Sequence, residues 1–284
     1  MPERTRVTIA HSPDSDDAFM FHAFANGKLD TGDLEIVEVL SDIEALNQRC
    51  LRGELDVSAA SVHAYAYIAD RYAILSCGAS MGDGYGPVVV SKQRFAAGDL
   101  EGRTIAIPGA LTSATLALRL FQPDFQPRIM PFDRILDAVA EGSVDAGCLI
   151  HEGQLTFGRR NLHLVADLGA WWRERTGLPL PLGVNVVKKD LGEGRIRRIA
   201  GLLRQSIDYA LDHRGEALDH AMGYARGLDR GLADRFVGMY VNDLTRDLGE
   251  RGRDAIRLFL KEGFTAKILP MLIHPEFVPP EKSA

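Results

Sequence analysis

The stretch 141-EGSVDAGCLIHEGQLTF-157 carries the clearest α/β signal in the chain. Residues 132–139 before it place apolar side chains at the i, i+3, i+4 and i+7 spacing of a one-sided helix, which Gly142 can end. The apolar run 146–150 then predicts a buried strand whose carboxyl end presents His151. Because ligands of open α/β sheets bind outside the carboxyl ends of strands, His151 is the first candidate for chemistry. The alternative is a strand-end histidine that only hydrogen-bonds a neighbour.

The composition is that of an ordinary globular protein. The chain has 284 residues, of which 46% are hydrophobic and 25% charged, enough for one large domain or two smaller ones. A net charge of −6 argues against nucleic acid or an anionic membrane as a partner. Three scattered cysteines without a CxxC pair indicate neither a disulfide framework nor a cysteine zinc site. We see no targeting or membrane-spanning segment and expect a cytoplasmic protein.

The opening stretch has the same organisation. Residues 7–10 predict a strand, and Asp14 and Asp16 in the following turn can begin a helix. The helix dipole alone explains acidic residues at that position, and the alternative is a role in holding substrate hydroxyls or a cation. The pattern of residues 7–21 returns in residues 104–118, so we infer two related α/β halves.

Residues 43–63 repeat the helix, glycine and strand order of the deciding stretch. A helix is followed by Gly53, a strand around residues 55–59, and a polar end that carries Ser61 and His63.

A third polar cluster follows the strand predicted near residues 104–107. Thr112 and Ser113 begin a helix there, where free backbone N–H groups form a natural carboxylate or phosphate site. Ordinary helix capping is the alternative. The segment lacks the lysine of a nucleotide-triphosphate loop.

Two segments rich in glycine and proline, 82–92 and 176–189, each enter a short strand. We interpret them as hinge crossings between two lobes, with ordinary turns as the alternative. The expected division is lobe 1 from residues 1–90 and 185–284, and lobe 2 from residues 91–184.

The remaining chain is predicted to be helical from residue 194 onward. The tail 276–284, with its proline pair and terminal charges, is expected to be loose.

Five segments together resemble the 1,4-dihydroxy-6-naphthoate synthase family of the futalosine route to menaquinone. They are SPDSDDAFMFHAF, YGPVVVSK, IAIPGALTSAT, FDRILDAVAEGSVDAGCLIHEGQLTF and DLGAWWRERTGLPLPLG, with IHEG and WWRERTGLPLPLG the most specific. The resemblance implies an α/β, two-lobed, periplasmic-binding-protein-like (type II) fold with a ligand cleft between the lobes. It also implies a cytoplasmic carbon–carbon lyase without a cofactor, which converts cyclic dehypoxanthinylfutalosine to 1,4-dihydroxy-6-naphthoate.

The resemblance also implies roles for particular residues. The proton acceptor of the family falls on His151, and a neutral imidazole with a pKa near ~6.5 suits proton removal at cytoplasmic pH. The small anionic substrate is expected to bind near the second helix start and the nearby strand ends. The expected substrate-binding residues are Ser12, Asp14, Asp16, Ala59, Ser61, His63, Thr112, Ser113, Ala114 and Glu152.

The chain departs from the family at two places. The family opens with a Ser-Pro-Cys-Pro-Asn-Asp type of run, whereas this chain carries Asp14 and Asp16. Ala59 replaces a family lysine, and His63 follows it, either as a second acid/base or as a polar strand-end residue. Since an anionic substrate would meet a less positive site, a side-branch enzyme acting on a modified intermediate is an alternative.

Two other function classes remain open. One is a non-catalytic protein that captures a small carboxylate in the same cleft. The other is a metal-dependent hydrolase using His11, Asp14 and Asp16, which we disfavour because hard-metal sites need more ligands than this loop offers. We therefore expect no metal and no cofactor.

Overall fold

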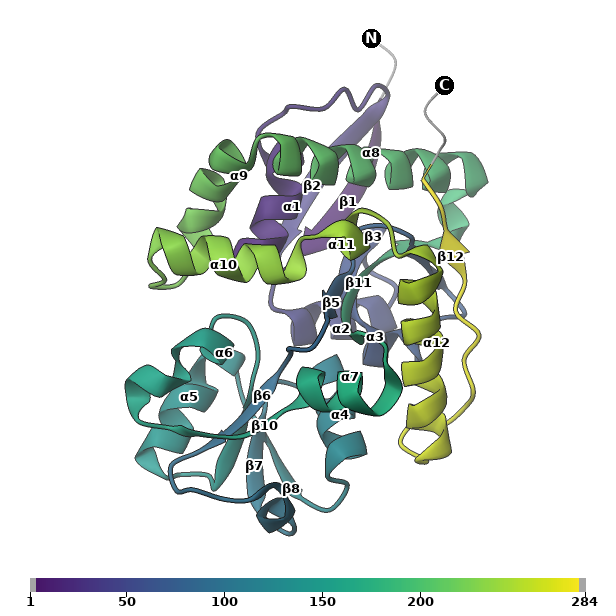
Figure 1. The fold of residues 1–284 in the computed structure, drawn as a ribbon. Helices are drawn as coiled ribbons and strands as arrows, with labels where there is room; N and C mark the ends of the chain where they lie inside the picture. Colours follow the sequence, from purple (N-terminus) through teal and green to yellow (C-terminus); the bar gives the residue numbers. More distant parts are fainter. Residues whose placement is uncertain (1–3, 281–284) are drawn as a thin grey trace.

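The computed structural model describes residues 4–280 and has two β-sheets flanked by helices (Figure 1). The first sheet has the order β12-β4-β11-β3-β1-β2, with β5 paired to β11; the second has the order β10-β6-β9-β7-β8. The strands of the first sheet are β1 (Thr5–His11), β2 (Leu34–Leu40), β3 (Val57–Ser61), β4 (Tyr72–Leu75), β5 (Ser80–Gly82), β11 (Leu180–Lys188) and β12 (Phe277–Val278). Those of the second are β6 (Val88–Ser91), β7 (Thr104–Ile107), β8 (Gln126–Ile129), β9 (Ala146–Leu149) and β10 (His163–Asp167). The predicted α/β arrangement in two parts is thus present.

Helices cover both sheets, and α8, α9 and α10 lie together over the first sheet at the top of Figure 1. The helices are α1 (Ser15–Ala25), α2 (Ile43–Leu51), α3 (Val62–Tyr65), α4 (Ser113–Phe121), α5 (Phe132–Glu141), α6 (Gly153–Thr156), α7 (Leu168–Thr176), α8 (Glu193–Asp212), α9 (Arg214–Ala221), α10 (Arg230–Tyr240), α11 (Asp243–Arg246) and α12 (Gly249–Thr265). The predicted helix over residues 132–141 is confirmed, and Gly142 ends it with a φ of 79°. Among residues 4–280, no helix is long and apolar enough to cross a membrane.

The same parallel three-strand unit occurs in each sheet. In the first, β1 lies between β2 and β3; in the second, β7 lies between β8 and β9. An aspartate before the last strand of each unit binds back to the first strand. Asp56 accepts from the Thr8 backbone N–H at 2.8 Å, and Asp145 accepts from the Thr104 N–H at 2.9 Å. The structure therefore supports the two related halves inferred from the sequence.

The strand predicted at residues 55–59 is displaced. It runs from Val57 to Ser61, because Asp56 is engaged with Thr8 and the parallel ladder starts only at Val57. The shift keeps Ser61 at the carboxyl end of the strand.

The prediction of a loose tail is wrong for part of it. Phe277 and Val278 form β12, which pairs in parallel with the edge strand β4. The Arg253 and Arg257 guanidinium groups lie over the Phe277 ring, at 5.7 and 5.4 Å from its centroid, and hold it on the sheet. Residues 281–284 of the predicted tail lie outside the described residues.

The chain passes between the sheets twice, from β5 to β6 and back through α7 to β11. The two passages touch: a Cβ at Gly169 would lie 1.8 Å from the Tyr85 carbonyl oxygen, so only glycine fits. Asp83 in the first passage forms an ion pair with Arg251 at 2.9 Å and another with Arg173 at 3.4 Å. A hinge function for these passages, and lobe limits at residues 90 and 184, stay predictions.

Candidate active site

A cavity lies where the strand ends of both sheets meet. Its wall includes nine residues that the sequence singled out: Ser12, Asp14, Asp16, Ala59, Ser61, Thr112, Ser113, Ala114 and His151. They come from four separate stretches of the chain. A concave wall of mixed polar and apolar residues is typical of a small-molecule site.

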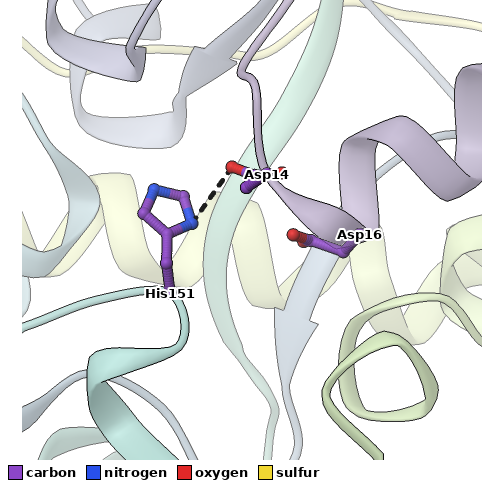
Figure 2. A group of neighbouring side chains, drawn as sticks. All are labelled: Asp14, Asp16 and His151. Atoms are coloured by element: carbon purple, nitrogen blue, oxygen red, sulfur yellow. Dashed lines mark ion pairs between the residues drawn. The ribbon is translucent and has the colours of Figure 1, made fainter. Parts of the chain in front are cut away.

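His151 lies just beyond β9, on the second half, and faces the first half. Its Nδ1 atom is 3.1 Å from the Asp14 Oδ2 atom, and its side chain is 16% exposed (Figure 2). The residue has a φ of 52°, an uncommon backbone conformation for a residue with a side chain. The ring of Phe132 contacts the imidazole edge to face, with centroids 4.7 Å apart. A strained, oriented and partly accessible imidazole is suited to proton transfer.

Gln154 and Tyr240 support the backbone of His151. With the Gln154 amide nitrogen facing the Gly86 carbonyl at 2.6 Å, the amide oxygen accepts from the His151 N–H at 3.2 Å. The Tyr240 hydroxyl lies 2.6 Å from the same amide group. One buried amide therefore joins α10, the first passage between the sheets and the candidate base.

The N-cap and first turn of α1 hold three carboxylates in three environments. Asp14 is the N-cap of α1; burial by itself raises its pKa, but the nearby His151 imidazole and several hydrogen bonds lower it below the usual value. Burial, followed by the Asp14 charge, raises the pKa of Asp17 to about 6. Burial and the charges of Asp14 and Asp17 raise the pKa of Asp16 well above its usual value. Asp14 is thus the member of the turn best able to remain ionised.

The second helix start is capped as predicted. Thr112 is the N-cap of α4, and its hydroxyl accepts from the Thr115 N–H at 3.3 Å. The Ser113 hydroxyl donates to the Leu182 carbonyl at 2.5 Å, which ties α4 to β11. The positive end of the helix dipole therefore faces the cavity.

Two predicted substrate contacts lie behind the wall rather than on it. His63 is 3% exposed, its Nδ1–H donates to the Thr112 carbonyl at 3.2 Å, and burial lowers its pKa to about 4. Glu152 is buried with its Oε1 atom 3.5 Å from the Ser15 hydroxyl, and burial raises its pKa. His63 is placed as the polar strand-end alternative requires.

The trio His11, Asp14 and Asp16 considered for a metal hydrolase does not form. The His11 Nε2 atom lies 2.7 Å from the Glu38 Oε1 atom, and its Nδ1 lies 3.0 Å from the Ser12 carbonyl. The structure instead groups Asp14, Asp16 and His151, whose potential ligand atoms all lie within 4.8 Å of one another.

Sequence reasoning missed several polar residues of the cavity wall, namely Ser80, Gln154, Asn185 and Tyr240. Asn185 left a signal, because a lone amide within the apolar run of β11 is unusual. Tyr240 gave no such signal, since an aromatic residue on an amphipathic helix is normally interpreted as a core residue.

Comparison with known proteins gives the family. The model of a family described as menaquinone biosynthesis matches residues 7–265. The chain belongs to this menaquinone biosynthesis family. A 1,4-dihydroxy-6-naphthoate synthase of Thermus thermophilus is 43% identical, over 89% of this chain and 92% of the relative. That of Streptomyces coelicolor is 38% identical, over 94% of this chain and 95% of the relative.

Two solved structures share the fold of this chain. The crystal structure of protein AF1704 from Archaeoglobus fulgidus is 47% identical, with a TM-score of 0.89, over 93% of this chain and 98% of that one. The alkanesulfonate-binding protein SsuA from Xanthomonas axonopodis has a TM-score of 0.76 at 15% identity, over 98% of this chain and 100% of that one. The second likeness concerns the fold alone. Together these findings confirm the family and the periplasmic-binding-protein-like fold predicted from the sequence.

Proposed function

We propose that this chain is a lyase that converts cyclic dehypoxanthinylfutalosine to 1,4-dihydroxy-6-naphthoate, with His151 as the general base. The observation that carries the proposal is the His151–Asp14 pair on the wall of the cavity, in a chain of the menaquinone biosynthesis family. Family membership supports the reaction, and the pair supports the base. A cytoplasmic location belongs to the proposal, because a biosynthetic enzyme meets its intermediates there.

The pair suits a base for a geometric reason. When Nδ1 carries the proton and donates it to the Asp14 carboxylate, the lone pair of the ring is on Nε2, which points away from Asp14 in Figure 2. The carboxylate fixes this tautomer and stabilises the imidazolium that forms when a substrate proton is taken. General-base help of this kind accelerates a reaction by roughly a hundred- to ten-thousand-fold.

The remaining wall would bind and orient the substrate. In this proposal the amino end of α4 at Thr112 holds a substrate carboxylate, and Ser61 and Ser113 lie on the adjoining wall. The contacts of Asp14 with His151 and of Tyr240 with Gln154 join the two halves around the ligand and exclude water from the reacting bond.

A second candidate is a side-branch enzyme of the same family that acts on a modified, less anionic intermediate. It is favoured by the wall itself, where Ala59 lines the cavity and Asp14, Asp16 and Asp17 add buried carboxyl groups. Such a wall is less favourable for an anion than a wall with a lysine.

Turnover of cyclic dehypoxanthinylfutalosine by the purified protein tests the proposal, with naphthoate release followed by absorbance and binding followed by calorimetry. We expect release by the wild type, and binding with little turnover by His151→Asn. His213→Asn serves as the matched control, because His213 is exposed and absent from the cavity wall. Binding without release by the wild type would favour the side branch or a carboxylate-binding protein, and no binding would reject this substrate.

A further inference from the structure

One group of side chains in the cavity has the composition of a metal site. Asp14, Asp16 and His151 each contribute one potential ligand atom, and these atoms all lie within 4.8 Å of one another. Figure 2 shows the two carboxylates and the imidazole converging from α1 and from the loop after β9. Ligand atoms at roughly 2.0–2.2 Å from a zinc ion are at most about 4.4 Å apart. Shifts of roughly a few tenths of an ångström in the side-chain atoms would therefore complete the site.

Asp16 provides an independent indication of a ligand. The residue is 7% exposed and lines the cavity, yet its buried Oδ1 atom has no hydrogen-bond partner within residues 4–280. Buried carboxylate oxygens in folded proteins are almost always hydrogen-bonded or bound to a cation, since leaving one without either is costly.

The charge around the cluster also favours a cation. Of the described residues on the cavity wall, none is a lysine or arginine, whereas three are aspartates. Arg226 lies close by, but it donates to the Pro13 carbonyl at 3.2 Å and stacks on the Phe132 ring at 4.5 Å. No side-chain cation therefore reaches the free oxygen of Asp16 from the wall.

We propose that Asp14, Asp16 and His151 bind one divalent transition-metal ion of the Zn²⁺ class, with its open coordination positions facing the cavity. Carboxylate and imidazole are both ligands of such ions, and three protein ligands leave a position for water or a substrate oxygen. The inference rests on the same site as the proposed function. Because the ion takes the Nδ1 lone pair of His151 and displaces its pairing with Asp14, metal binding and base catalysis exclude one another. Zn²⁺ is therefore an inhibitor that competes with the base.

Zinc binding by the full-length protein tests this inference directly. Metal-stripped wild type is titrated with Zn²⁺ against a chromophoric chelator, together with Asp16→Asn, His151→Gln and the exposed control Asp70→Asn. We expect one ion per wild-type chain and unchanged zinc affinity in Asp70→Asn. Asp16→Asn and His151→Gln should each lose at least tenfold in zinc affinity. Circular dichroism verifies that each variant is folded. Absence of a wild-type site, or an unchanged site in folded Asp16→Asn, overturns the inference.

Activity in the same samples separates the inference from the proposed function. Added Zn²⁺ should reduce naphthoate release by the wild type at least tenfold, and chelator should restore it. Zinc binding in a wild type that releases no naphthoate supports the metal site and rejects the lyase. Turnover that requires Zn²⁺ supports the metal site and rejects His151 as the base.

Discussion

His63 and His151 occupy matching places in the two halves but have different surroundings. Each lies two residues beyond a strand, after a helix and a left-handed glycine, and each contacts the N-cap of the first helix of the opposite half. His63 meets the carbonyl of Thr112, whereas His151 meets the carboxylate of Asp14. The neutral carbonyl favours the charged ring only weakly, so burial dominates at His63 and lowers its pKa, whereas the Asp14 carboxylate carries a charge that can stabilise the imidazolium of His151. The same chain pattern thus yields a structural histidine in one half and a candidate base in the other.

The sharpest test exchanges each histidine for glutamine. We expect His151→Gln to lower kcat for naphthoate release roughly a hundred- to ten-thousand-fold, because the base is lost. His63→Gln should change kcat by less than about tenfold, since the ring is buried against Thr112. Steady-state kinetics on both folded variants measures the difference. Equal losses would show that the two histidines are not functionally distinct.

The dependence of stability on pH tests whether His63, unlike His151, is a buried neutral side chain. Burial lowers the pKa of His63 to about 4 in the folded protein, from 6.5 in the unfolded chain. The unfolded chain therefore binds the proton first as the pH falls, and this contribution to the free energy of unfolding is lost between pH 6.5 and 4. We expect a loss of roughly 2 kcal/mol at pH 5 and roughly 3 kcal/mol in total.

Urea unfolding at pH 7 and pH 5 measures this effect, with His63→Gln as the reference. The wild type should lose more stability than the variant over that interval. Parallel pH dependence of the two proteins would contradict a neutral, buried His63.

Asp14→Asn tests the partner of His151. The amide still caps α1 but carries no charge, so it stabilises the imidazolium less. We expect kcat to fall about tenfold to a hundredfold while the free energy of unfolding changes by less than about 1 kcal/mol. Asp42→Asn is the matched control, because Asp42 caps α2 and is not on the cavity wall. An equal kinetic effect of both variants would remove Asp14 from the mechanism.

The last prediction concerns the two aspartates that tie the matching strand units together. Asp56 accepts from both the N–H and the hydroxyl of Thr8, whereas Asp145 accepts from the Thr104 N–H and is 44% exposed. Asp56→Ala should therefore cost about 1–3 kcal/mol of stability and Asp145→Ala about 0.5–1 kcal/mol. Chemical denaturation measures both values. A larger cost for Asp145→Ala would show that the two units are not held together in the same way.

Local patterns were enough to predict much of the fold. The helix over residues 132–141, its end at Gly142, and the capping by Asp14 and Thr112 depend on contacts between residues close together in the sequence. The start of β3 and the pairing of β12 were predicted wrongly, because each is decided by a partner distant in the chain.

By itself the sequence determined the two related α/β units, their polar strand ends and, through its resemblance to a family, which residues to gather in one cavity. Only the tertiary structure determined which partner each polar group contacts. It placed Asp14 against His151, turned His11 toward Glu38, buried His63 behind Thr112 and, within residues 4–280, left one oxygen of Asp16 without a hydrogen-bond partner. The physical reason is that secondary structure follows from local backbone and side-chain preferences, whereas the charge state and reactivity of a side chain follow from burial and from neighbours supplied by other segments.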